Sequence, residues 1–183
     1  ASSILRENLS SKIISITGSC GKTSLKELTG KSLSKISQAT YSQRSFNNKF
    51  GVPLSLFNLK KNDSFGVFEI GMDKKGEIDY LSKIIKPDVG VITNISYAHI
   101  KNFKNISEIA LAKSEIIKNI KDDGYLILNQ DDKFYNFHKQ IGLKRNLKIL
   151  SFSSRNKSAT INLDSITKEK SKYKISININ KKK

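Results

Sequence analysis

Short apolar runs alternate along the chain with longer segments in which apolar residues recur every three or four positions. Such runs are typical of buried parallel strands, and the periodic segments are typical of amphipathic helices. The pattern predicts strands at 13–17, 65–70, 89–92, 125–128 and 147–152. It predicts helices at 24–37, 53–59, 77–85, 107–120 and 131–141. This alternation predicts an α/β fold in which helices flank a mostly parallel sheet.

The two ends of the chain depart from the alternation. Residues 1–12 are polar and predict no element, so we interpret them as a lead-in or linker to one domain over 13–183. Apolar and polar side chains alternate singly over 159–167 and 172–180. This spacing predicts an antiparallel β-hairpin appended to the α/β core.

The composition bounds the class of protein. The chain has 183 residues and 37% hydrophobic residues, enough for one domain with a modest core. No apolar run approaches the length of a membrane span, and Cys20 is the one cysteine. A lone cysteine fits a reducing compartment. We therefore expect a cytoplasmic, monomeric protein without a membrane span.

The formal net charge of +17 raises the hypothesis of nucleic-acid binding. Only four of the 33 basic residues are arginines, the preferred base readers, and the lysines are spread along the chain. We interpret this surface as a solvated one without a nucleic-acid partner. The charge would equally attract an anionic nucleotide or a polyanionic substrate.

The segment after the first predicted strand has the composition of a phosphate-binding loop. A glycine turn leads through a Gly-Lys-Thr sequence into a predicted helix, where backbone N–H groups, the helix dipole and a lysine can bind phosphates. The threonine hydroxyl can bind Mg²⁺. The loop is short, because Ile16 stands where most such loops have their first glycine. The predicted nucleotide-binding residues are Gly18, Ser19, Cys20, Gly21, Lys22, Thr23 and Ser24.

Three further residues interrupt the apolar pattern near the carboxyl ends of predicted strands or within a predicted helix stripe. Glu69 ends a buried strand, where an acid beside a phosphate loop commonly handles Mg²⁺. Lys113 lies within the apolar stripe of its helix, as either a buried amine or a lysine that reaches solvent from the stripe's edge. His99 follows the strand 89–92 and is either a ligand or a hydrogen-bonded loop residue. His138 is interpreted as non-functional.

Several ordered motifs resemble the Mur ligases, in particular the central ATPase domain of members that join D-alanyl-D-alanine to UDP-N-acetylmuramoyl-tripeptide. The resemblance covers roughly residues 13–152. It begins with the short phosphate loop and continues through Asn47-Asn48 with Gly51-Val52-Pro53, Glu69-Ile70-Gly71 with Gly76-Glu77-Ile78, Thr93-Asn94-Ile95, Ala112-Lys113-x-Glu115 and Leu128-Asn129-x-Asp131-Asp132. So many motifs in the same order make a chance agreement improbable.

The resemblance implies a role for each motif residue. Lys22 would hold the β- and γ-phosphates of ATP, and Thr23 with Glu69 would bind one Mg²⁺. His99 would bind a second metal, supported by Lys113, which several family members carry in carbamylated form. The catalytic set is then Lys22, Lys113 and His99. Asn129 would approach the adenine, and Asn47 and Asn48 would lie near the substrate.

The implied chemistry is amide formation in peptidoglycan synthesis, and hence in cell wall biogenesis, cell shape and cell division. The carboxylate of UDP-MurNAc-tripeptide attacks the γ-phosphate of ATP to give an acyl phosphate, and the amine of D-Ala-D-Ala then displaces phosphate. Other P-loop classes remain as alternatives: a small kinase, a nucleic-acid-stimulated ATPase or a folylpolyglutamate-synthase-like ligase. A remnant that keeps only the fold is another alternative.

Two departures from the family pattern qualify the resemblance. Arg44-Ser45-Phe46 stands where the family usually has Gly-Asn. The family's N-terminal domain, its Gly-x-His-Asn-x-x-Asn segment and its C-terminal domain have no counterpart in these 183 residues. We therefore expect an incomplete enzyme that binds ATP weakly and does not ligate by itself.

Overall fold

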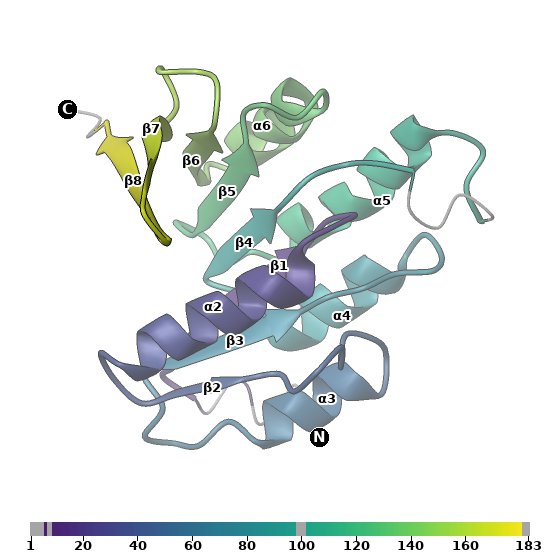
Figure 1. The fold of residues 1–183 in the computed structure, drawn as a ribbon. Helices are drawn as coiled ribbons and strands as arrows, with labels where there is room; N and C mark the ends of the chain where they lie inside the picture. Colours follow the sequence, from purple (N-terminus) through teal and green to yellow (C-terminus); the bar gives the residue numbers. More distant parts are fainter. Residues whose placement is uncertain (1–5, 7–8, 98–101, 181–183) are drawn as a thin grey trace.

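A computed structural model describes the chain except for residues 1–5, 7–8, 98–101 and 181–183. Within the described residues, eight strands form one sheet in the order β2-β3-β1-β4-β5-β6-β7-β8 (Figure 1). The strands are β1 (Lys12–Thr17), β2 (Ala39–Tyr41), β3 (Phe65–Glu69), β4 (Val89–Ile92), β5 (Tyr125–Asn129), β6 (Lys148–Ser153), β7 (Ile161–Glu169) and β8 (Lys172–Ile179). The helices are α2 (Lys22–Ser34), α3 (Gly51–Phe57), α4 (Glu77–Ile85), α5 (Ile106–Lys118) and α6 (Tyr135–Lys144).

The sheet is parallel from β2 through β7, and only β8 runs antiparallel, against β7. The chain leaves β1 toward β2 and β3, and later leaves β4 toward β5 and β6 on the other side. The strand order therefore reverses between β1 and β4. In open α/β sheets the ligand crevice lies at this switch point, outside the carboxyl ends of the strands.

Helices cover the two faces of the sheet unequally (Figure 1). On one face α2 packs over β1, β2 and β3, around a small cluster of Ile16, Val67 and Val91. On the other face α3, α4, α5 and α6 close a much larger apolar core, in which Ile13 of β1 is fully buried. Apolar side chains on both faces of β1 explain why Ile13, Ile14 and Ile16 stand so close together, with only Ser15 between them.

The predicted fold class is confirmed, with differences at element boundaries. Strand β2 was not predicted, because three half-buried residues carry too little apolar pattern. Helix α6 begins at Tyr135 rather than 131, because a turn precedes it. In that turn Asp132 accepts hydrogen bonds from the backbone N–H of Phe134 through Oδ1 and of Tyr135 through its carbonyl. The predicted hairpin is present as β7 and β8.

Part of the predicted lead-in is packed rather than loose. Arg6 is 2% exposed, and its guanidinium donates hydrogen bonds to the carbonyl of Ile85 at 2.8 Å and to Asp88 Oδ2 at 3.0 Å. Leu9 is buried in the larger core. No helix of the described residues is long and apolar enough to cross a membrane.

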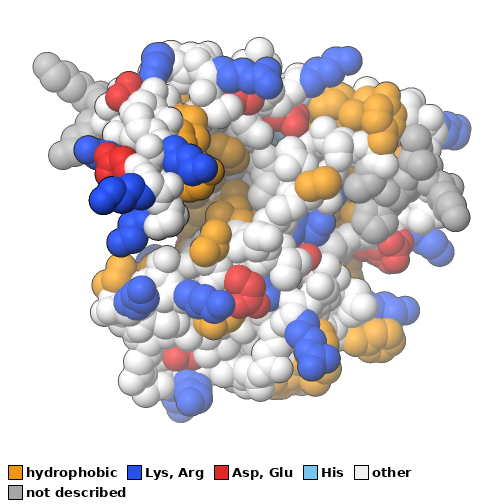
Figure 2. Space-filling view, viewed as in Figure 1, with side chains coloured by type: hydrophobic (Ala, Val, Ile, Leu, Met, Phe, Trp, Pro, Cys, Tyr) orange, Lys and Arg blue, Asp and Glu red, His pale blue; other side chains and the backbone are white. Residues whose placement is uncertain are grey.

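Basic side chains do not gather in one patch on the face shown in Figure 2. Lysines and arginines are scattered over it among uncharged and acidic side chains. This distribution agrees with the spread of lysine along the sequence.

Candidate functional site

The phosphate loop connects β1 to α2 and leaves the start of the helix open. Gly21, at φ 80°, is the residue before α2, and no side chain of the described residues caps the helix. The first N–H groups of a helix have no partner within it, and they carry the positive end of the helix dipole. An uncapped start, followed at once by Lys22 and Thr23, is suited to bind an anion.

Lys22 is folded back over its own loop. Its Nζ atom donates hydrogen bonds to the carbonyls of Gly18 at 2.9 Å and Ser19 at 3.3 Å. An anion at the start of α2 would compete with these two carbonyls for the N–H donors of the Lys22 ammonium group. The lysine is thus held next to the uncapped helix end, where it can exchange two backbone carbonyls for phosphate oxygens.

The loop after β4 supports the phosphate loop. The side chain of Asn94 accepts a hydrogen bond from Cys20 N at 3.0 Å and donates one to the Cys20 carbonyl at 3.2 Å. Thr93 Oγ1 donates to the same carbonyl at 2.8 Å, and Ser19 Oγ exchanges hydrogen bonds with the backbone of Ser96. The Cys20 N–H, predicted to face the nucleotide, is therefore occupied by Asn94 in this structure.

Glycine is required at position 18 for two reasons. Its φ of +144° lies in a region that L side chains rarely adopt, and a Cβ placed there would lie 1.9 Å from Thr93 Oγ1. Gly21 differs, because a Cβ there would meet nothing within 4 Å. The short loop therefore depends on a close approach between Gly18 and the end of β4.

Glu69 and Thr23 meet at the carboxyl ends of β3 and β1. Thr23 Oγ1 donates to Glu69 Oε2 at 2.7 Å, and Asn47 Nδ2 donates to the other carboxylate oxygen, Oε1, also at 2.7 Å. Glu69 is only 1% exposed and forms no ion pair with any described residue. A buried carboxylate without a cationic partner is costly, and a bound cation would remove that cost.

These two oxygen ligands fit Mg²⁺ rather than a transition metal. No group of three or more His, Cys, Asp or Glu side chains that could hold a metal occurs among the described residues. Mg²⁺ is commonly bound by one or two carboxylates together with phosphate oxygens and water. The carboxylate of Glu69 and the hydroxyl of Thr23, beside an open helix end, supply that kind of site.

Lys113 lies beneath the phosphate loop on α5. It is 2% exposed, and its Nζ atom donates to the Gly18 carbonyl at 2.9 Å, the same oxygen that Lys22 contacts. Burial, and next the positive charge of Lys22, lower the pKa of Lys113 to about 7. Of the two alternatives left by the sequence, the structure selects the buried amine.

The other predicted site residues lie in different settings. His99 lies outside the described residues. Asn129 ends β5, and its Oδ1 accepts from Asp131 N at 3.0 Å. Asn48 Oδ1 accepts from the backbone N–H groups of Phe50 and Gly51, so this amide fixes the turn that begins α3. Asn47, by contrast, is directed at Glu69.

His138 is buried, and its Nε2 lies 3.0 Å from the Ala110 carbonyl, where it joins α6 to α5. Burial lowers the pKa of His138. The interpretation that His138 is non-functional stays a prediction.

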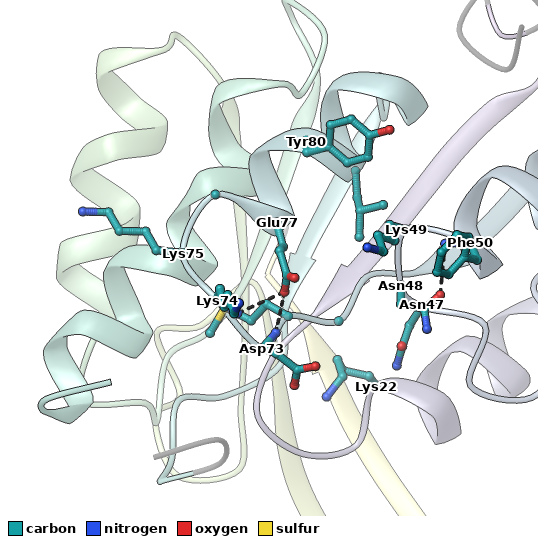
Figure 3. A pocket seen from close by; sticks show the side chains of 14 residues that line it. Lys22, Asn47, Asn48, Lys49, Phe50, Asp73, Lys74, Lys75, Glu77 and Tyr80 are labelled. Carbon is teal, nitrogen blue, oxygen red and sulfur yellow. Dashed lines mark hydrogen bonds between the residues drawn. The ribbon is translucent and has the colours of Figure 1, made fainter. Parts of the chain in front are cut away.

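A cavity of about 1030 Å³ opens between the start of α2, the loop before α3 and the start of α4 (Figure 3). It is lined by Lys22, Asn47 and Asn48, by Gly71, Gly76 and Glu77 of the quoted motifs, and by residues that the sequence did not single out, among them Lys49, Asp73, Lys74 and Lys75. Four lysines and two carboxylates are among the lining side chains: Lys22, Lys49, Lys74, Lys75, Asp73 and Glu77. The excess of positive charge suits an anionic ligand.

The sequence missed residues that position the site through backbone hydrogen bonds. Glu115 is buried, and it accepts hydrogen bonds from Gly76 N at 2.8 and 3.0 Å and from Asp79 N at 3.1 Å, so it fixes the start of α4 beside the cavity. Asn94 fixes the phosphate loop. Both residues stand in quoted motifs, but nothing in their spacing identified these bonds.

A phosphate loop after β1 and an acid at the end of the adjacent strand define a nucleotide-binding α/β domain of the P-loop type. The chain belongs to the Mur ligase middle domain family, whose model matches residues 16–183. A curated relative is UDP-N-acetylmuramoyl-tripeptide–D-alanyl-D-alanine ligase of Buchnera aphidicola subsp. Acyrthosiphon pisum. It is 41% identical over 154 residues, which cover 84% of this chain and 33% of that protein.

Solved structures agree with this family. MurF of Acinetobacter baumannii superposes with a TM-score of 0.89 at 33% identity, covering 97% of this chain and 38% of that one. MurF of Thermotoga maritima in complex with ADP has a TM-score of 0.83 at 27% identity, covering 96% and 40%. The chain spans about a third of the length of the curated relatives it matches.

Proposed function

We propose that this chain is the ATP- and Mg²⁺-binding part of an amide ligase that joins D-Ala-D-Ala to UDP-MurNAc-tripeptide. One observation carries the proposal. The uncapped start of α2, Lys22 and the hydrogen-bonded pair of Thr23 and Glu69 lie together where the strand order of the sheet reverses. Relatives named as this ligase, two of them at 41% and 36% identity, support it. They give no support to a small kinase, a nucleic-acid-stimulated ATPase or a folylpolyglutamate synthase.

The described residues suit distinct tasks in such a reaction. The N–H groups at the start of α2 and the Lys22 ammonium bind and orient the phosphates of ATP. Thr23 and Glu69 would hold the Mg²⁺, which neutralises charge on the phosphates. The basic cavity beside Lys22 would hold the carboxylate-bearing end of the anionic substrate near the γ-phosphate. Asn129, at the end of β5, would lie near the adenine.

Lys113 fits the carbamylation that the family resemblance implies. A lysine can react with CO₂ only as the neutral amine, and the pKa of Lys113 is lowered to about 7. The carbamate would carry a negative charge and would, with His99, support a second metal. We also expect the protein to act as a monomer in the cytoplasm.

The first test is the binding of ADP to the 183-residue chain, measured by calorimetry with Mg²⁺ and with EDTA. We expect weak binding that Mg²⁺ strengthens. In Glu69→Gln the affinity in EDTA should be unchanged, whereas the strengthening by Mg²⁺ should fall at least tenfold, because a carboxylate ligand is lost. Glu169→Gln, an exposed acid on β7, is the matched control and should behave as the wild type. Absence of ADP binding by the wild type would refute the proposed function.

Ligation is tested on a longer protein that contains this chain. The 183 residues alone should bind nucleotide without turnover, and measured ligation by them would contradict this expectation. In the longer protein, Glu69→Ala and Lys113→Ala should each lower turnover at least tenfold. Unchanged turnover in both variants would refute the metal roles.

A further inference from the structure

Lys26 is a charged residue of α2 for which the nucleotide site gives no use. It lies one turn after Lys22 and is 0% exposed. Its Nζ atom donates hydrogen bonds to the carbonyls of Ser42 at 2.6 Å and Arg44 at 2.7 Å, and to Glu27 Oε1 at 2.8 Å. An ammonium group has three N–H donors, and each of them therefore has an acceptor.

The two carbonyls belong to the segment 42–47, which leads from β2 to Asn47. Arg44 has a φ of +46°, in the left-handed region that favours glycine. A non-glycine residue in that region costs of the order of 1 kcal/mol or more, so surrounding contacts must hold it there. The Lys26 ammonium, bonded to the carbonyls of residues 42 and 44, is such a contact.

The same segment reaches Glu69 at two points. The backbone N–H of Glu69 donates to Ser42 Oγ at 3.3 Å, and Asn47 Nδ2 donates to Glu69 Oε1 at 2.7 Å. In addition, Gly71 N donates to the Asn47 carbonyl at 2.8 Å. Segment 42–47 is thus hydrogen-bonded to Lys26 at residues 42 and 44 and to one oxygen of Glu69 at Asn47, and the backbone between residues 44 and 47 connects these contacts. The other oxygen is left facing Thr23.

Packing alone does not explain a lysine at this position. A methionine has a similar stem and would avoid burying a charge, which is costly unless every donor is matched. What a methionine could not do is bind two carbonyls of a segment that lies 16 and 18 residues further along the chain. The charge therefore serves to hold that segment against α2.

We propose that Lys26 is a positioning residue for the metal site: it fixes segment 42–47 to the phosphate-loop helix, so that Asn47 holds Glu69 with one oxygen directed at Thr23. The inference rests on the proposed function, because it concerns the Mg²⁺ that Thr23 and Glu69 would bind. Partners that orient metal ligands typically change metal affinity by about 10- to 100-fold when they are removed.

The test measures how much Mg²⁺ strengthens the binding of ADP to the 183-residue chain that carries Lys26→Met. We expect the ratio of affinities with Mg²⁺ and with EDTA to fall about tenfold, while the affinity in EDTA stays within twofold of the wild type. Lys31→Met, an exposed lysine on the same helix, is the matched control and should leave the ratio unchanged. Circular dichroism establishes that each variant is folded. If Lys26→Met is unfolded, Lys26→Gln carries the same comparison.

A double variant separates positioning from a general loss of stability. If Lys26 acts through Asn47, Lys26→Met combined with Asn47→Ala should lower the Mg²⁺ ratio no further than Asn47→Ala alone. Amide hydrogen exchange should also rise over 42–48 in Lys26→Met but not in β1. A ratio equal to the wild type, or fully additive effects, would overturn the inference while leaving the proposed function intact. Absence of ADP binding by the wild type would overturn both.

Discussion

Gly18→Ala is expected to lower the affinity of the chain for ADP at least 100-fold. The new methyl group would lie 1.9 Å from Thr93 Oγ1 and 3.0 Å from Thr93 Cβ and N, so the phosphate loop and the end of β4 must separate. The backbone at φ +144° adds strain of roughly 1–3 kcal/mol. Separation displaces the carbonyl that both Lys22 and Lys113 contact, and with it the phosphate-binding groups.

Gly21→Ala is the matched control for this prediction. Gly21 also has a positive φ, of 80°, but a Cβ there would meet nothing within 4 Å. Gly21→Ala should lower the free energy of unfolding only by the cost of a positive φ for alanine, roughly 1 kcal/mol. It should retain measurable ADP binding. Calorimetry gives the affinities, and urea unfolding gives the stabilities. Equal losses in the two variants would show that strain, and not the contact with Thr93, governs the loop.

The alternation of strands and helices was predictable because both faces of the sheet are covered. A strand buried on both faces carries apolar residues at neighbouring positions rather than at every second one, and this explains the correct assignment of β1, β3 and β4. Strand β2 lacks that signal, since it is short and lies at the sheet edge. The start of α6 was misplaced because a side-chain turn at Asp132, and not apolar periodicity, sets it.

The meeting of Thr23 and Glu69 was also predictable, for a topological reason. Adjacent parallel strands end at the same edge of a sheet, and the register places Ile16 of β1 beside Glu69 of β3. The hydrogen bonds of Lys26, Asn94 and Glu115 were not predictable, because each side chain bonds to backbone groups distant in sequence. Lysine on a helix ordinarily indicates a solvated position, and nothing in the spacing marks Lys26 as buried.

The stability of the wild-type chain is expected to rise more steeply between pH 7 and pH 9 than that of Lys113→Met. In the folded protein, burial and the charge of Lys22 lower the pKa of Lys113 to about 7. In the unfolded chain a lysine has a pKa near 10.4. Between these values the unfolded state binds more protons than the folded state, so stability increases with pH. The destabilisation caused by burying the charged Lys113 is complete below pH 7. It is relieved as the pH rises toward 10.

The size of the effect follows from the same linkage. A lowered pKa of this kind changes stability by at most about 1.4 kcal/mol per pH unit, or about 2 kcal/mol in total between pH 7 and pH 9. Urea unfolding in CO₂-free buffer measures it as the difference between wild type and Lys113→Met at each pH. Lys118→Met, an exposed lysine on the same helix, should follow the wild type. Parallel pH profiles for wild type and Lys113→Met would show that the buried amine keeps an ordinary pKa, and would remove the basis for its reaction with CO₂.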